Sequence, residues 1–126
     1  MEKDKLAELL SKDLIIGYVY GYDGERQGYY FENTPSNIAN FIMLHKENAN
    51  KMILTDMADR LVLNTFGEFI NHCPDQELLQ EILKDLVPMQ IGDKEPVSIP
   101  IAGEEEVQAF WGKEEQNVME AEFRML

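Results

Sequence analysis

Cysteine is almost absent from this sequence, whose 126 residues include a single cysteine, Cys73. A single thiol cannot close an internal disulfide, so nothing in the sequence indicates an oxidising compartment. No apolar run approaches the roughly 20 residues of a membrane-spanning helix. Residues 1–5 are mostly charged, and the apolar patch that follows them is too short for a secretory signal. We therefore expect a cytoplasmic protein that does not associate with membranes.

Basic side chains are also scarce. Eleven Lys and Arg face 24 Asp and Glu, for a net charge of −13. Residues 1–50 carry −3 of this charge, with five basic and eight acidic side chains, and residues 51–126 carry −10. Nucleic-acid and anionic membrane surfaces are bound mainly through basic side chains, so we predict neither interaction. A basic protein partner is compatible with this charge, and so is a role in solubility alone.

The motifs of common catalytic sites are missing as well. The sequence contains no phosphate-binding Gly-x-x-x-x-Gly-Lys-Ser/Thr loop, no His-Glu-x-x-His pair and no Gly-x-Ser-x-Gly elbow. Zinc sites need several spaced Cys or His ligands, whereas this chain has one Cys and two His. We predict no catalytic residues, cofactor or metal. An enzyme would have to use Asp56, His72 or Cys73.

Helix and strand signals alternate in the first half of the chain. Leucines at helical spacing begin it, and two runs rich in aromatic and β-branched residues follow, joined by an Asp-Gly turn. Thr34 can cap a helix in which Pro35 takes the first position. The predicted elements are a helix at 2–11, strands at 14–22 and 27–32, and a helix from 35 to about 47.

The second half is less regular. Apolar runs predict strands at 51–55 and 60–65, although a single helix over 52–64 fits the same periodicity. Residues 66–70 are expected to continue irregularly, and a helix opening at Pro74-Asp75 is expected to end at Pro88. Beyond it we predict an extended connection at 88–103 with an edge strand at 97–101. A helical segment at 104–126 would break at Gly112, with Met119, Phe123 and Leu126 facing the body.

These elements predict one α+β domain spanning residues 1–126. Two strand–strand–helix units would supply an antiparallel sheet of about four strands, with the helices packed on one face and a helical C-terminus.

Two groups of side chains are candidates for binding a partner. Tyr18, Tyr20 and Tyr22 alternate along one predicted strand and Tyr29 lies on the next, so they form either an exposed protein-binding face or cross-strand packing within the sheet. Trp111 lies near Glu105 and Glu106 on the C-terminal segment. It either anchors that segment to the body or contacts a partner, while the two acids suit a basic partner or a solvated helix face.

Four short segments resemble small acidic proteins of bacterial mobile elements, some of which carry a "resolvase" label. The segments are Leu54-Thr55-Asp56, Leu63-Asn64-Thr65-Phe66-Gly67, Cys73-Pro74-Asp75-Gln76-Glu77 and Leu86-Val87-Pro88-Met89-Gln90. The resemblance covers about the middle third of the chain and implies no particular chemistry. A serine resolvase needs a nucleophilic serine among arginines, and both residue types are few here.

Three functions remain open from the sequence. The first is a non-catalytic protein-binding or accessory module of a bacterial cell, which binds another protein or a second copy. The second is an acidic DNA mimic that occupies a basic nucleic-acid-binding protein, which requires carboxylates spaced along one elongated surface. The third is the small enzyme that uses Asp56, His72 or Cys73.

Overall fold

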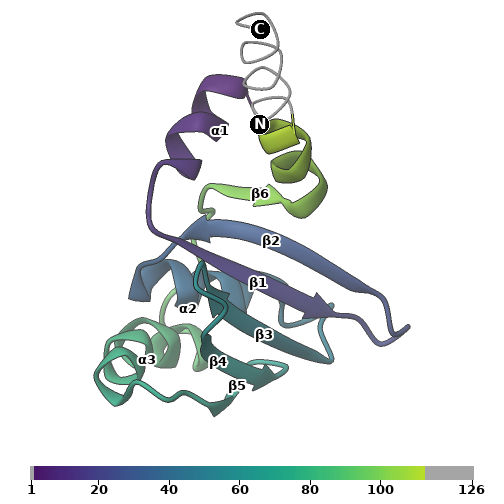
Figure 1. The fold of residues 1–126 in the computed structure, drawn as a ribbon. Coiled ribbons are helices and arrows are strands. Elements are labelled where there is room, and N and C mark those ends of the chain that lie inside the picture. The colour runs from purple at the N-terminus through teal and green to yellow at the C-terminus, as the bar shows by residue number, and fades with distance from the viewer. Residues whose placement is uncertain (1, 113–126) are drawn as a thin grey trace, which may run out of the picture.

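The computed structural model describes residues 2–112, which form a six-stranded sheet with helices on both faces (Figure 1). A C-terminal helix is described over residues 104–112. No helix within residues 2–112 has the length and apolar character needed to cross a membrane. The other elements are α1 (Lys3–Leu10), β1 (Leu14–Tyr20), β2 (Arg26–Glu32), α2 (Pro35–His45), β3 (Lys51–Asp56), β4 (Leu61–Phe66), β5 (Phe69–His72), α3 (Gln76–Gln90) and β6 (Ile101–Gly103).

The strands lie in the order β5-β4-β3-β1-β2-β6, and all neighbours are antiparallel. β1 lies between β3 and β2, so it is an interior strand of the sheet. An interior strand covered on both faces must be apolar at successive positions, and the run Leu14-Ile15-Ile16 meets that requirement. Alternate residues of β1 therefore enter two different cores.

One core lies between the sheet and α2 and α3, and we call this side of the sheet the inner face. Ring stacking links the layers, because Phe31 of β2 and Phe41 of α2 have centroids 4.6 Å apart. Further members of the inner core are Ile15, Val19, Ile38, Ile42, Met52, Leu54, Leu63, Cys73, Ile82 and Leu86.

A second core lies on the opposite, outer face, under α1 and the C-terminal helix. It contains Leu6, Leu9, Leu14, Ile16, Tyr30, Ala102 and Val107. In Figure 1 α1 and the C-terminal helix lie beside β6, apart from α2 and α3. The prediction that the helices pack on one face is therefore wrong, because β1 and β2 present apolar side chains to both sides.

Local signals placed the first elements correctly. Oγ1 of Thr34 accepts a hydrogen bond from the Asn37 N–H at 3.1 Å, so Thr34 caps α2 as predicted. α2 ends at His45, about two residues earlier than expected. Oδ1 of Asp75 caps α3 in the same way, accepting from Glu77 N and Leu78 N at 3.1 Å.

The α+β antiparallel class is confirmed, but the sheet has six strands rather than about four. Residues 66–70 are not irregular, because a two-residue turn at Gly67 and Glu68 starts β5. The edge strand predicted at 97–101 is wrong in position, because the strand there, β6, spans Ile101–Gly103 and shares only Ile101 with the predicted range. The alternative of one helix over 52–64 is wrong, since β3 and β4 pair there.

Pro88 does not end its helix. It lies inside α3, which continues to Gln90. A proline removes one backbone donor, and so close to the helix end it disrupts little. The Pro88 carbonyl accepts from Asp93 N at 2.8 Å, which closes the helix end. Gly112 is still helical, and Met119, Phe123 and Leu126 lie outside the described residues.

Candidate functional site

A groove of about 550 Å³ lies between β5, at one edge of the sheet, and α3. Leu79 and Leu83, four residues apart on α3, are both half-buried against the inner core. Two amide side chains of α3 fix its position relative to β5. Gln90 donates to the carbonyl of Glu68 at 2.9 Å, and Gln76 donates to the carbonyl of Cys73 at 3.0 Å.

The groove contains no Asp, Glu, Lys or Arg among the described residues that line it, although 28% of the chain is charged. Protein interfaces are similarly depleted of charge at their centres. The lining residues are Phe69, Ile70, Asn71, His72, Cys73, Pro74, Gln76, Leu79, Leu83, Leu86 and Gln90.

Two phenylalanines are exposed on the β4–β5 hairpin, and one of them, Phe69, lines the groove. Phe66 is 61% exposed and Phe69 is 67% exposed, and they lie directly opposite each other on β4 and β5. Gly67 begins the two-residue turn between them with φ +59°, a conformation that glycine adopts without strain. Exposed aromatic side chains beside a groove are typical of protein-binding surfaces.

The two phenylalanines end a row that crosses the sheet. Residues directly opposite on neighbouring antiparallel strands share a face. The register links Arg26 to Tyr20, Tyr20 to Lys51, Lys51 to Phe66 and Phe66 to Phe69. This row lies on the outer face of the sheet, as Tyr18 does, but outside the part of that face that α1 and the C-terminal helix cover.

The four predicted tyrosines do not form one surface. The Arg26 guanidinium lies 4.8 Å from the centre of the Tyr18 ring, and the Lys51 ammonium lies 4.6 Å from that of Tyr20. Tyr22 follows β1 and is 76% exposed. Tyr29 lies on the inner face, where its ring contacts Phe41 and His45.

A second cavity, of about 640 Å³, lies between the β1–β2 hairpin and the end of α2. Its walls include Tyr22 and Tyr29 together with the acids Asp23, Glu25 and Glu47. His45 also lines it, between the rings of Tyr29 and Phe41, with centroid distances of 4.8 and 4.5 Å. Burial lowers the pKa of His45, so its ring is neutral at pH 7.

Trp111 anchors the C-terminal helix. Its ring meets Tyr30 edge-on, with centroids 5.5 Å apart, and it packs against the outer core. Glu105 on the same helix is exposed and Glu106 is half-buried. The contact with Tyr30 favours the first of the two predicted roles of Trp111, the attachment of its segment to the body.

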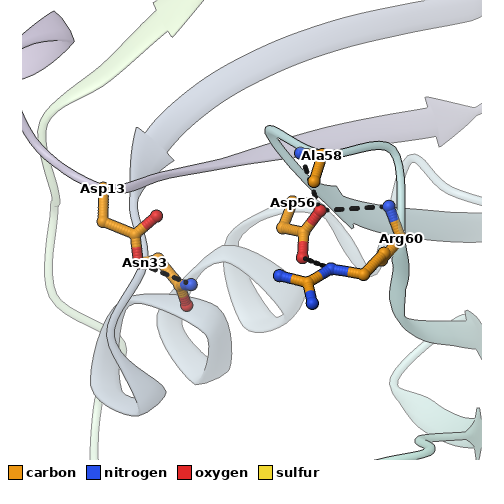
Figure 2. A network of polar contacts seen from close by, with 5 residues as sticks. All are labelled: Asp13, Asn33, Asp56, Ala58 and Arg60. Carbon is orange, nitrogen blue, oxygen red and sulfur yellow. Dashed lines mark hydrogen bonds and ion pairs between the residues drawn. The ribbon is translucent and has the colours of Figure 1, made fainter.

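The residues of the predicted enzyme alternative have separate structural roles. Figure 2 shows the Asp56 carboxylate accepting from the N–H groups of Ala58 and Arg60 and from the Arg60 guanidinium, at 2.9 to 3.0 Å. The hydrogen bond from the Arg60 backbone is the main reason why the pKa of Asp56 lies below its usual range. The carboxylate stays ionised and organises the β3–β4 turn.

Cys73 and His72 lie elsewhere. The Cys73 thiol is buried and donates to the carbonyl of Asp75 at 3.4 Å, and burial raises its pKa. The cysteine is therefore a poor nucleophile. His72 of β5 pairs with Asn64 of β4. Asn64 lies three residues, or about 10 Å, along β4 from Leu61, which pairs with Thr55 beside Asp56. Within residues 2–112, no group of three His, Cys, Asp or Glu is placed to hold a metal ion.

Sequence reasoning missed the groove and its phenylalanines. The segment Phe66-Gly67-Glu68-Phe69 does carry a hairpin signal, since glycine at the first central position suits a two-residue turn. A search of protein families, of curated proteins and of solved structures found no match to this chain. The resemblance to small acidic proteins of mobile elements therefore stays a prediction.

Proposed function

We propose that this chain is a non-catalytic protein-binding module, and that its binding site is the groove between β5 and α3 together with Phe66 and Phe69. The observation that carries the proposal is a charge-free groove in a chain of net charge −13. Solvated surfaces of such a chain are expected to be acidic. A groove without Asp, Glu, Lys or Arg in its described lining, with the exposed ring of Phe69 at its border, has the composition of an interface centre.

The other two functions are less well supported. A DNA mimic needs unpaired carboxylates in a regular array, whereas the groove that carries the proposal has no Asp or Glu among its described lining residues. An enzyme needs reactive groups that converge on one site. Here Asp56 organises a turn, and burial raises the pKa of the Cys73 thiol at a separate position. Protein binding requires neither arrangement.

The proposal can be tested with a phage-displayed library of random peptides, selected against the full-length protein. We expect enrichment of apolar, uncharged peptides. Phe69→Ser removes an exposed ring at little risk to folding, and Leu83→Lys places a charge in the groove. Each variant is expected to weaken a selected peptide at least about tenfold, which corresponds to about 1.4 kcal/mol. Affinity is measured by fluorescence polarisation.

Val87→Lys is the matched control, because it adds the same charge to an exposed position of α3 outside the groove lining. Its affinity for the peptide is expected to stay within about twofold of wild type. Circular dichroism checks that each variant is folded. The proposal fails if no peptide is enriched. It also fails if the enriched peptides are basic and bind the groove variants as well as the wild type.

A further inference from the structure

The strand that borders the groove is also the open edge of the sheet. β5 ends the strand order, with β4 as its only described neighbour. In a two-residue hairpin the residues flanking the turn bond to each other, so here Phe66 and Phe69 exchange both hydrogen bonds. The backbone N–H and C=O of the next residue, Ile70, therefore point away from β4. No other described group is hydrogen-bonded to the Ile70 backbone.

This edge lacks two of the features that normally prevent an edge from pairing, namely charged side chains and proline. Natural proteins protect edge strands with charged side chains, prolines, bulges or very short strands. The sequence of β5 is Phe-Ile-Asn-His, without a charged residue or a proline. The opposite edge is β6, which has three residues and directly follows Pro100. β5 does have a bulge near Asn71 and a length of only four residues, and both features limit an added ladder to a few residues.

From these observations we infer that the partner binds by strand addition, contributing an extended, uncharged segment that pairs with the outer edge of β5. This inference rests on the proposed function and specifies its geometry. An added strand would lie about 4.8 Å beyond β5 and would point alternate side chains to opposite faces. One set would enter the groove toward Leu79 and Leu83, and the other would lie beside Phe69 on the outer face.

The groove on the inner face and Phe69 on the outer face together determine which partner sequence is recognised. Because the groove is charge-free and Phe69 is exposed, apolar side chains are favoured at successive positions of the partner segment rather than at alternate ones. Such a segment resembles a buried strand more than a surface strand. Backbone hydrogen bonds would supply affinity, and the groove would select the side chains.

Two other occupants fit the surface less well. A second copy would bring together two chains of net charge −13 across a strand of four residues. A contact confined to those four residues would fall short of the roughly 800 Å² per partner of a stable interface. Residues 113–126 contain four glutamates, and their longest uncharged run has four residues, 116–119. They also follow a helix that packs on the outer face beside β6, at the opposite edge of the sheet.

The experiment uses a peptide from the library selection. Each backbone amide of the peptide is methylated in turn, which removes a donor but keeps the side chain. Strand addition predicts that methylation at alternate positions weakens binding to the full-length protein at least about tenfold, while the positions between stay within about twofold. Loss of binding on methylation at every interior position would indicate a helix in the groove, since all interior N–H groups of a helix donate within it, and would overturn the inference. Uniform tolerance of methylation would also overturn it.

A matched pair of protein variants gives an independent test. Ile70→Pro removes the outward N–H at an edge position that tolerates proline, and Ile70→Ala shortens the side chain but keeps the N–H. We expect Ile70→Pro to weaken the peptide at least about tenfold more than Ile70→Ala does. Equal effects would overturn strand addition. The methylation series needs no protein variant, so the test holds even if Ile70→Pro does not fold.

The outcomes also separate the alternatives. Binding that is lost in Phe69→Ser but insensitive to peptide methylation leaves the protein-binding proposal intact and refutes strand addition alone. A dimer seen by light scattering in the wild type and lost in Ile70→Pro would assign the edge to a second copy. Displacement of the selected peptide by a synthetic peptide of residues 113–126 would assign it to this chain. Either result overturns the inference of a separate partner.

Discussion

At the residue scale, His45 shows how burial sets protonation in this fold. It occupies the last turn of α2 between two aromatic rings and lines the larger cavity beside three acids. Burial disfavours the charged imidazole and so lowers the pKa of His45. The folded state therefore binds a proton at His45 less readily than the unfolded chain does.

This shift predicts a pH-dependent part of the stability. A histidine whose folded pKa lies below its unfolded value of about 6.5 stabilises the fold above that pH and loses this contribution as the pH falls through the folded pKa. We expect the free energy of unfolding, measured by urea titration, to decline more steeply in wild type than in His45→Gln between pH 7.5 and pH 5. The comparison cancels the titration of shared carboxylates. Parallel curves for the two proteins would contradict the prediction.

At the element scale, close packing between β1 and α2 depends on one small residue. Gly17 lies on the inner face of β1 between Ile15 and Val19, opposite the ring of Phe41. A Cβ atom at this position would lie 2.6 Å from Cε1 and Cζ of Phe41 and 3.3 Å from Cε1 of Phe31. The two rings are already stacked, so neither can move without disturbing the core.

Gly17→Ala is therefore expected to lower the free energy of unfolding by about 1 to 3 kcal/mol, the usual cost of overpacking a core. Urea denaturation followed by circular dichroism measures the change. Gly103→Ala is the control, because a Cβ at that position in β6 meets no atom within 4 Å. Its stability should stay within about 0.5 kcal/mol of wild type. A Gly17→Ala variant as stable as this control would show that α2 can move away from β1.

At the scale of the whole molecule, negative charge is the dominant surface property. The chain has an excess of 13 acidic groups over basic ones, and the described ion pairs neutralise only five acids. Two of these pairs join separate elements, since Lys46–Glu68 links the end of α2 to the β4–β5 turn and Lys12–Glu32 links the segment before β1 to β2. The remaining acids repel one another in the compact state.

We expect added NaCl to stabilise the protein for this reason. The free energy of unfolding in urea should rise from about 0.01 M to about 0.15 M salt, as the screening length falls from about 30 to about 8 Å. A Glu8→Lys/Glu105→Lys variant has a net charge of −9 instead of −13, and its salt dependence should be weaker. Stability that falls with salt would show that the ion pairs outweigh the repulsion.

Periodicity in the sequence was sufficient for the elements whose signals are local. Thr34 caps α2, Asp23-Gly24 turns the β1–β2 hairpin with Gly24 at φ +84°, and β3 and β4 lie within two residues of their predicted positions. The candidate site was not predictable in this way. Phe66 and Phe69 are apolar residues like those of the core, and only their positions on the outer face, beyond the described helices of the outer core, leave them exposed.

The amino-acid sequence alone therefore determined the α+β class, the acidic surface and the local helix and hairpin signals, because each depends on composition or on neighbours a few residues apart. The tertiary structure decided the rest: six strands instead of about four, helices on both faces, and the groove at β5. β6 is a strand only because it pairs with β2, some seventy residues earlier in the chain. Likewise, β5 becomes an edge beside α3 only when the sheet is assembled, since nonlocal backbone pairing has no periodic signature in the sequence.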